Sequence, residues 1–67
     1  MSVAKVIEIS SVSPDSFEDA VRQGVARASK TVNNITAAWI QDQQVSVKSG
    51  QITEYRVLLK ITFVLED

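Results

Sequence analysis

The C-terminal half of the chain limits the possible folds most, because it predicts two long strands joined by one tight turn. Residues 53–63 alternate between apolar and polar side chains for most of their length and are rich in β-branched and aromatic residues, which is typical of a strand. The turn is Lys48-Ser49-Gly50-Gln51, whose central Ser-Gly pair suits a two-residue hairpin loop. We therefore expect the segment from Thr36 to Leu65, nearly half of a 67-residue chain, to form one hairpin.

A two-residue loop fixes which side chains oppose each other across this hairpin. One set of predicted pairs should face the helix together with Val57: Thr36 with Phe63, Ala38 with Ile61, and Ile40 with Leu59. The other set should lie on the opposite face of the sheet: Ala37 with Thr62, Trp39 with Lys60, Gln41 with Leu58, and Gln43 with Arg56. A slip of one residue would exchange the two sets, so the register decides which side chains are free to meet a ligand.

The segment before the hairpin predicts one helix over residues 14–32. Its apolar and small side chains recur with helical spacing and form one stripe: Phe17, Ala20, Val21, Gly24, Val25, Ala28 and Val32. Ser13 suits the N-cap and Pro14 the first helical position. Asn33-Asn34 is expected to end the helix, because asparagine tolerates a left-handed backbone. The small residues of the stripe should let the helix lie close to a sheet.

Residues 3–9 predict a short first strand, which makes the element order strand, helix, strand, strand. If the helix returns the chain across the sheet, the last strand pairs with both others, and all three strands are antiparallel. We therefore expect an α+β fold with sheet order 1-3-2 and the helix across one face, in a single domain covering residues 1–67.

The composition excludes several classes of protein. The chain has no cysteine and no histidine, which removes disulfides, thiolate metal sites and the commonest general base, and no carboxylate pair has a recognisable acid–base spacing. A net charge of −1 without a basic run argues against a nucleic-acid partner, and no apolar run reaches the roughly 20 residues of a membrane span. The N-terminus lacks a signal-peptide pattern, so we expect a cytoplasmic protein without enzymatic activity.

The predicted elements differ in length, and this leaves apolar residues uncovered. A helix of about 19 residues spans roughly 28 Å, whereas a strand of about 13 residues spans roughly 43 Å. The hairpin tip should therefore overhang the helix, with Val45, Val47 and Ile52 exposed. Trp39 and Leu58 should lie on the face away from the helix, where an exposed tryptophan indicates either a subunit interface or a platform for a ligand.

Several stretches, spread along almost the whole chain, match the pattern of one known family: Lys5–Ile9, Ser13–Phe17, Ala26–Ala28 with Lys30–Val32, Glu54–Val57 and Phe63–Asp67. In these stretches the chain resembles the dodecin family. The resemblance implies a β-α-β-β subunit, a hollow shell of twelve identical subunits, and flavins that are bound in pairs at two-fold axes and stored rather than converted. It also implies that some relatives bind coenzyme A and that one branch binds calcium instead of flavin.

The residues that would contact a flavin differ from the pattern that the resemblance implies. Ala37 occupies the position of the stacking tryptophan, Arg56 that of a glutamine in the last strand, and Gln44 that of an arginine in the second strand. Trp39 lies two residues after Ala37 and so points to the same face, about 6.6 Å along the strand. Its indole would either stack a planar ligand in a shifted pose or fill the pocket.

We expect the ligand site to consist of Ala37, Trp39, Gln44 and Arg56. The default ligand is a flavin, riboflavin or FMN, and the alternative is calcium or another small ligand. Arg56 can grip a carboxylate or phosphate or lie flat against an aromatic ring, and its competing role is an ion pair between subunits. A calcium ion would need several oxygen ligands converging on one point, and the candidate donors are Asp42, Glu54, Glu66 and Asp67.

Overall fold

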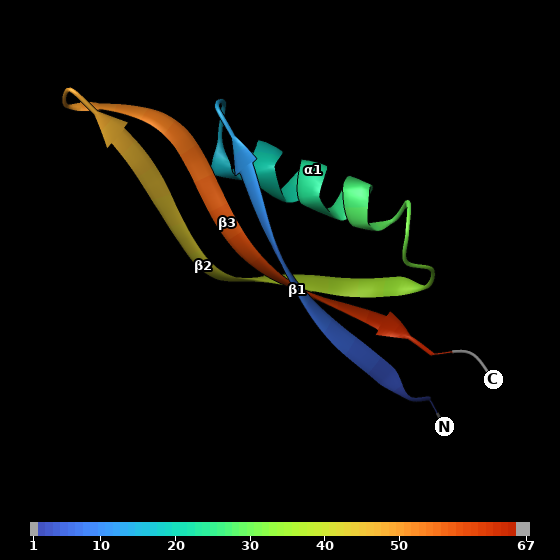
Figure 1. Cartoon of the computed structure of the whole chain (residues 1–67). Helices are drawn as coiled ribbons and strands as arrows, with labels where there is room; N and C mark the ends of the chain where they lie inside the picture. The colour runs from blue at the N-terminus through green and yellow to red at the C-terminus, as the bar shows by residue number, and fades with distance from the viewer. Residues whose placement is uncertain (1, 66–67) are drawn as a thin grey trace.

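The fold is a three-stranded antiparallel sheet with one helix on one of its faces (Figure 1). In the computed structural model, which describes residues 2–65, the elements follow in the order β1 (Ala4–Ser13), α1 (Phe17–Ala28), β2 (Ile35–Lys48) and β3 (Gln51–Val64). β3 lies in the middle and pairs antiparallel with both β1 and β2. The predicted α+β class, element order and sheet order are confirmed.

The junction between β1 and α1 differs from the prediction, because Ser16 rather than Ser13 caps the helix. The Ser16 side chain accepts a hydrogen bond from the Asp19 backbone N–H at 3.0 Å. Ser13 instead ends β1, which is longer than predicted, and is fully buried. Its hydroxyl donates to Asp19 Oδ2 at 2.6 Å and accepts from the Asp15 N–H at 3.0 Å. These two hydrogen bonds satisfy the buried Ser13 hydroxyl. Ser13 is therefore the last residue of β1, and Ser16 is the N-cap of the helix.

The helix is also shorter at its C-terminal end than the spacing of apolar residues predicts. It ends at Ala28, and hydroxyl side chains bond the carbonyl groups of its last turns. Ser29 Oγ donates to the Val25 carbonyl at 2.8 Å. Thr31 Oγ1 donates to the Ala28 carbonyl at 3.3 Å. Such bonds compete with continuation of the helix. Asn34 does adopt the left-handed backbone expected of asparagine, with φ 65°, but at the entry to β2.

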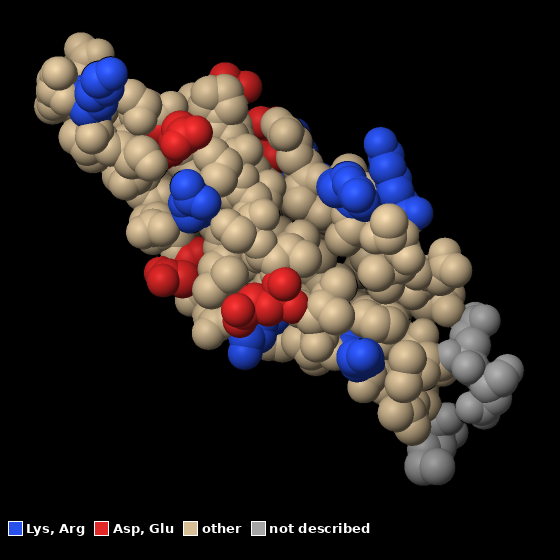
Figure 2. Space-filling model, viewed as in Figure 1, with Lys and Arg blue, Asp and Glu red and all other residues tan. Residues whose placement is uncertain are grey.

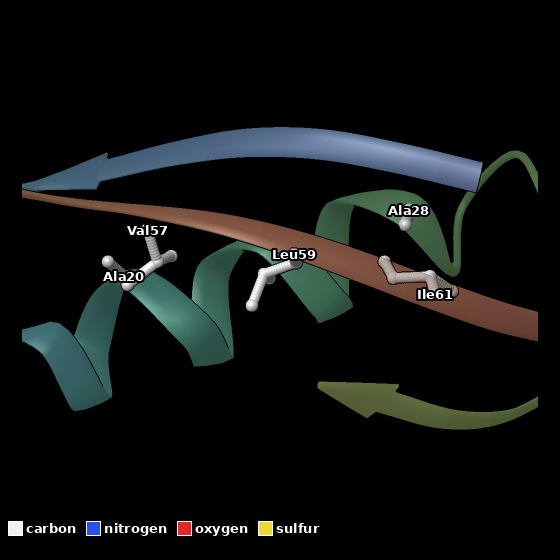
Figure 3. Close-up of a cluster of buried hydrophobic side chains, with 5 residues drawn as sticks. All are labelled: Ala20, Ala28, Val57, Leu59 and Ile61. Atoms are coloured by element: carbon white, nitrogen blue, oxygen red, sulfur yellow. The ribbon is translucent and has the colours of Figure 1, made fainter. Parts of the chain in front are cut away.

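The core is a small cluster between α1 and β3 (Figure 3). Its buried apolar members are Ala20 and Ala28 from the helix and Val57, Leu59 and Ile61 from the strand. The three strand residues confirm most of the predicted helix-facing set of β3, whereas its fourth member, Phe63, is only half-buried and lies outside the cluster. Gly24 allows the close approach, because a Cβ atom there would lie 3.0 Å from Leu59 Cδ1 and 3.1 Å from Ser11 Cβ. The expectation that small residues let the helix lie close to the sheet is therefore correct.

β2 lies outside the area that the helix covers. α1 packs mainly against β1 and β3. Ala38 and Ile40 are exposed, although their cross-strand partners Ile61 and Leu59 are buried, and Thr36 is exposed as well. The prediction that these β2 residues meet the helix is therefore wrong. A 12-residue helix above β1 and β3 does not extend over the edge strand.

The register of the β2–β3 hairpin agrees with the prediction at the turn and along part of its open end. Lys48 lies opposite Gln51, and residues 37–40 have the partners expected of them. A register shift at the start of β2 removes Thr36 from its predicted place opposite Phe63.

Between these two regions the register differs from the prediction by one residue. Gln44 rather than Gln43 lies opposite Arg56. The cause is two β-bulges, which leave Thr53 of β3 and Gln41 of β2 without a partner. The extra residue on β3 shifts the pairing by one position, and the extra residue on β2 shifts it back. Residue 40 therefore has its predicted partner again.

The hairpin tip extends well beyond α1 and β1 (Figure 1). The molecule measures 52 × 19 × 13 Å along its principal axes, and its radius of gyration of 13.8 Å exceeds the value of about 11 Å for a compact chain of this length. Val45, Val47 and Ile52 near the tip are exposed, as predicted, and the last two are 62% and 52% exposed. A single subunit therefore leaves much apolar surface in water.

Candidate ligand-binding site

The face of the sheet that α1 leaves open carries the predicted ligand residues. On β3, Arg56, Leu58 and Lys60 alternate with buried core residues and so point away from the helix. Trp39 lies opposite Lys60, and Gln44 lies opposite Arg56. We call this surface the helix-free face and define it by these residues: Trp39, Gln44, Arg56, Leu58 and Lys60.

Gln44 reaches the helix-free face only because β2 contains a bulge. Trp39 and Gln44 are five positions apart, so in a regular strand they would point to opposite faces. Gln41 is an extra residue without a cross-strand partner, so the alternation of side chains between the two faces shifts by one position after it. Gln44 therefore lies opposite Arg56, on the same face as Trp39. Ala37 precedes the bulge and shares the face of Trp39. The four residues predicted for the site therefore lie on one face of the sheet.

Gln44 and Arg56 line one depression of about 220 Å³ in this face. Its remaining lining residues are Ser10, Asp42, Gln43 and Leu58. Ser10 of β1 and Asp42 of β2 both lie opposite Leu58 of β3, so all three strands contribute to the lining. Residues that carry a guanidinium, an amide, a hydroxyl and a carboxylate therefore border this depression, whose lining surface is mostly apolar.

The Trp39 indole does not line this depression. It is 47% exposed, and its cross-strand neighbour Lys60 is four residues from Arg56. Four residues of a strand correspond to about 13 Å. Within one subunit, the predicted residues therefore fall into two groups on the same face: an aromatic group, Ala37 and Trp39, and a polar group, Gln44 and Arg56.

The Arg56 side chain has no acidic partner among residues 2–65. It is half-buried, and none of the side-chain hydrogen bonds or ion pairs within this part of the chain includes its guanidinium. The Asp42 carboxylate of the same depression accepts the Gln43 backbone N–H at 2.9 Å. The ion pair that does form joins Arg22 to Glu18 on the exposed side of the helix. Arg56 is thus free to bind a group from outside the subunit.

Side chains of like charge do not form a large patch on the surface shown in Figure 2. Acidic and basic groups alternate there, with uncharged surface between them. This distribution gives no basic stripe of the kind that follows a nucleic-acid backbone. Among residues 2–65, no helix combines the length and the apolar character that a membrane span requires.

The oxygen donors proposed for calcium do not gather within the described part of one subunit. Residues 2–65 contain no group of three or more acidic side chains that could hold a metal ion. Asp42 lies opposite Leu58, which is four residues from Glu54 along β3, or about 13 Å. The other predicted donors, Glu66 and Asp67, lie outside the described residues. Asp42 and Glu54 are therefore too far apart along the sheet to bind the same calcium ion within one subunit.

Ser10 is the lining residue that the sequence did not indicate. The predicted first strand ended at Ile9, whereas β1 continues through Ser10 to Ser13 alongside β3. The length of the predicted hairpin was a usable signal, since a strand beside so long a partner gains hydrogen bonds by extending. With β1 extended, the alternation of side chains puts Ser10 on the helix-free face.

The family of the chain follows from its match along nearly the whole sequence. The family model described as Dodecin matches residues 3–66. The chain belongs to the dodecin family. The predicted relationship is therefore confirmed, together with the β-α-β-β subunit that it implied.

Relatives of this dodecin include a calcium dodecin. The curated calcium dodecin of Mycobacterium tuberculosis is 40% identical over 63 residues, which cover 94% of this chain and 89% of the relative. The crystal structure of that organism's calcium dodecin, described as a calcium-chelating antigen with a novel calcium-binding site, matches with a TM-score of 0.82 at 38% identity. This match covers 96% of this chain and 91% of the other.

Other solved dodecins share the backbone even more fully. An arginine-to-alanine variant of the dodecin from T. thermophilus has a TM-score of 0.94 at 27% identity, with complete coverage of both chains. The dodecin from Streptomyces coelicolor has a TM-score of 0.93 at 32% identity and covers 98% of this chain and 94% of its own. Because one backbone serves relatives with different side chains, the ligand must be inferred from the residues on the helix-free face.

Proposed function

We propose that this dodecin is a non-enzymatic protein that binds and stores a flavin, riboflavin or FMN, between the subunits of a homododecameric shell. The observation that carries the proposal is the Trp39 indole, which is nearly half exposed on the helix-free face. An exposed, rigid aromatic ring on a sheet is a stacking surface for a planar ligand. Each subunit is one domain of residues 1–67, and the shell works in the cytoplasm without nucleic-acid or membrane partners.

The exposed apolar surface supports assembly into a shell. Five buried apolar residues form the whole core of residues 2–65, while β2 is exposed along most of its length. Val47 and Ile52 at the hairpin tip and Ile40 in mid-strand would all face water in a free subunit. A small domain with such a core is marginally stable, and a neighbouring subunit would supply the missing burial.

The chemistry of the helix-free face supports binding rather than catalysis. The face offers an indole, a guanidinium and amides, which stack against a ligand or donate hydrogen bonds to it. The chain has neither cysteine nor histidine to serve as nucleophile or general base. A flavin held in this way would be stored, with its ring shielded by the protein.

Ala37 gives the proposed site a shifted geometry. An alanine stands where the resemblance implies a stacking tryptophan, and the indole of Trp39 follows about 6.6 Å further along β2. Because the Ala37 side chain is too small to stack a planar ring, the flavin ring would stack on Trp39 itself. Arg56 and Gln44, on the same face, would supply polar contacts to the rest of the molecule.

Fluorescence titration tests the flavin proposal. Riboflavin and FMN should each be quenched on addition of the protein at micromolar concentration, and light scattering should give twelve times the 7.4 kDa mass of the chain. Trp39→Ala should weaken binding by about tenfold or more, since stacking on an aromatic ring contributes roughly 1–3 kcal/mol. Trp39→Phe, which keeps a ring, is the matched control and should retain most of the affinity. Absence of quenching for both flavins would contradict the proposal.

Calcium is the second candidate ligand, and the 40% identity to a calcium dodecin favours it. The donors would come from several subunits, with Asp42 and Glu54 joined by Glu66 and Asp67 from the C-terminal end of the chain. Calorimetric titration with calcium after chelator treatment should then give heat and raise the melting temperature. Asp42→Asn should reduce both effects if this carboxylate is a ligand, and no heat with the unaltered protein would count against calcium.

A further inference from the structure

A groove lies between α1 and β1, on the side of the sheet opposite the helix-free face. Its volume is about 530 Å³, which is within the range of about 300–1,000 Å³ typical of ligand pockets. Polar side chains form part of its lining, and both elements and the segment after the helix supply the apolar part: Ile7, Ile9, Val12, Gly24, Ala28 and Val32. This α1–β1 groove therefore has room for apolar side chains from outside the subunit.

The hairpin tip presents apolar side chains on the same side of the sheet. Val45 lies opposite Tyr55, whose ring packs against that of Phe17 at the start of α1, with 5.1 Å between the ring centroids. Val47 follows on the same face as Val45 and lies opposite Ile52. The tip thus continues the core side of the sheet beyond the helix, and its apolar side chains stay exposed.

One subunit cannot place its own tip in its own groove. The tip lies beyond the N-terminal end of α1, whereas the groove runs along the C-terminal half of the helix, from Gly24 to Val32 (Figure 1). We propose that the hairpin tip of one subunit packs into the α1–β1 groove of a second copy of this chain. The inference rests on the proposed shell and names two surfaces that hold it together.

The surroundings of the groove fit a second copy of the chain. β1 forms an edge of the sheet beside the groove, and natural proteins commonly cover such an edge. In the described part of the chain, Arg27 is the one charged residue that lines the groove, and Glu54 lies at the base of the tip. Neither forms an ion pair within residues 2–65, and the cation of the tip, Lys48, lies further out beside the turn. Charge complementarity therefore favours the same contact.

The tip and the groove are different surfaces, so the proposed contact is heterologous and repeats head to tail from one copy to the next. A repeated contact of this kind closes into a ring or continues as a filament. A shell of fixed size requires the ring. A two-fold contact joins a surface to itself, so the tip–groove contact is separate from any two-fold contact of the proposed shell.

Mixing of two variants tests the contact. The tip variant carries Val47→Asp with Ile52→Asp, and the groove variant carries Thr31→Asp with Val32→Asp, at positions outside the core cluster. Each variant alone should lose the twelve-chain mass, because charges replace an apolar contact. Mixed in equal amounts, the two should form species that contain both chains in equal numbers, measured by native mass spectrometry. Each variant then supplies the surface that the other lacks.

A control variant separates the groove from the added charge. Ser29→Asp with Asn33→Asp places the same two charges on exposed residues of the same segment, outside the groove, and should keep the twelve-chain mass. Circular dichroism should show that every variant is folded.

The outcomes separate this inference from the proposed shell. If two folded variants form no mixed species while the unaltered protein keeps its twelve-chain mass, the tip–groove contact is overturned and the shell stands. A twelve-chain mass for either variant alone would also overturn the contact. A mass of one or two chains for the unaltered protein would overturn both the shell and the contact.

Cysteine cross-linking keeps the contact testable if an aspartate variant fails to fold. The chain has no cysteine, so Val32→Cys with Val47→Cys introduces one thiol in the groove and one at the tip. A short bismaleimide should join such subunits into products of three or more chains on a denaturing gel, because each copy offers both surfaces. Ser29→Cys with Val47→Cys is the control and should give far less of these products. Products no larger than dimers from the first pair would overturn the contact.

Discussion

β2 and β3 have the same length of fourteen residues, yet one holds the core and the other is almost wholly exposed. β3 lies between two strands and beneath α1, and it contributes Val57, Leu59 and Ile61 to the buried cluster. β2 lies at the sheet edge, beyond the helix, and its Ile40 is 46% exposed. The comparison teaches that β3 stabilises the subunit, whereas β2 leaves its side chains exposed, and the proposed function assigns this surface to neighbouring subunits and a ligand.

The hairpin tip provides the strongest test of this division. Val47→Asp combined with Ile52→Asp should abolish assembly, because charges would replace the apolar side chains that we expect to meet a neighbour. Light scattering should then give a mass near one or two chains instead of twelve. Ser49→Asp is the control, since it adds a carboxylate in the turn, where Ser49 already has φ 54° and aspartate tolerates that backbone. An unchanged mass for the double variant would place the contacts elsewhere.

A pair of cross-strand neighbours tests the contrast in the middle of the hairpin. Leu59 is fully buried, and Ile40, its partner on β2, is not. Leu59→Ala should lower the free energy of unfolding by about 2–5 kcal/mol, because it removes buried methyl groups and leaves a cavity. In subunits kept apart by the Val47→Asp and Ile52→Asp changes, Ile40→Ala should cost much less in urea denaturation. Similar costs for the two changes in such subunits would contradict the difference in burial between β2 and β3.

Gly24→Ala should have the smallest of the three effects and sharpens the role of the helix contact. The new Cβ would lie 3.0 Å from Leu59 Cδ1 and 3.1 Å from Ser11 Cβ, so these neighbours or α1 would have to shift by a few tenths of an ångström. Overpacking costs roughly 1–3 kcal/mol, and the better helix propensity of alanine returns up to about 1 kcal/mol. We expect a net loss of about 1 kcal/mol, measured as a lower melting temperature. Arg27→Ala on the exposed side of the helix should change it little, and a more stable Gly24→Ala variant would contradict the close contact.

The sequence predicted the main elements of the fold because their signals are local. Alternation of apolar and polar residues marked the second hairpin strand, and the Ser-Gly turn set the register at Lys48 and Gln51. The small and apolar stripe of the helix gave its buried face, including Ala20, Gly24 and Ala28. The predicted strand order was the simplest all-antiparallel arrangement of these elements, with the last strand in the middle, and it is confirmed.

The sequence predicted part of the candidate site for the same reason. Period-two geometry put Trp39 and Arg56 on the face away from the helix, and the structure agrees. It misplaced the partner of Arg56 and missed Ser10, because both depend on how far strands pair and where a bulge falls. No residue type in β2 indicates the bulge at Gln41. Its position depends on how the two twisted strands pair with each other.

The sequence by itself thus determined the β-α-β-β order, the core face of β3 and the exposed tryptophan, since each follows from local turn signals or from the periodic spacing of side chains. Only the tertiary structure decided that Ser16 caps the helix while Ser13 is buried, that the helix covers β1 and β3 but not β2, and that Gln44 joins Arg56 in one depression. These features depend on contacts between residues far apart in the chain, where competing local preferences are nearly equal and packing selects one.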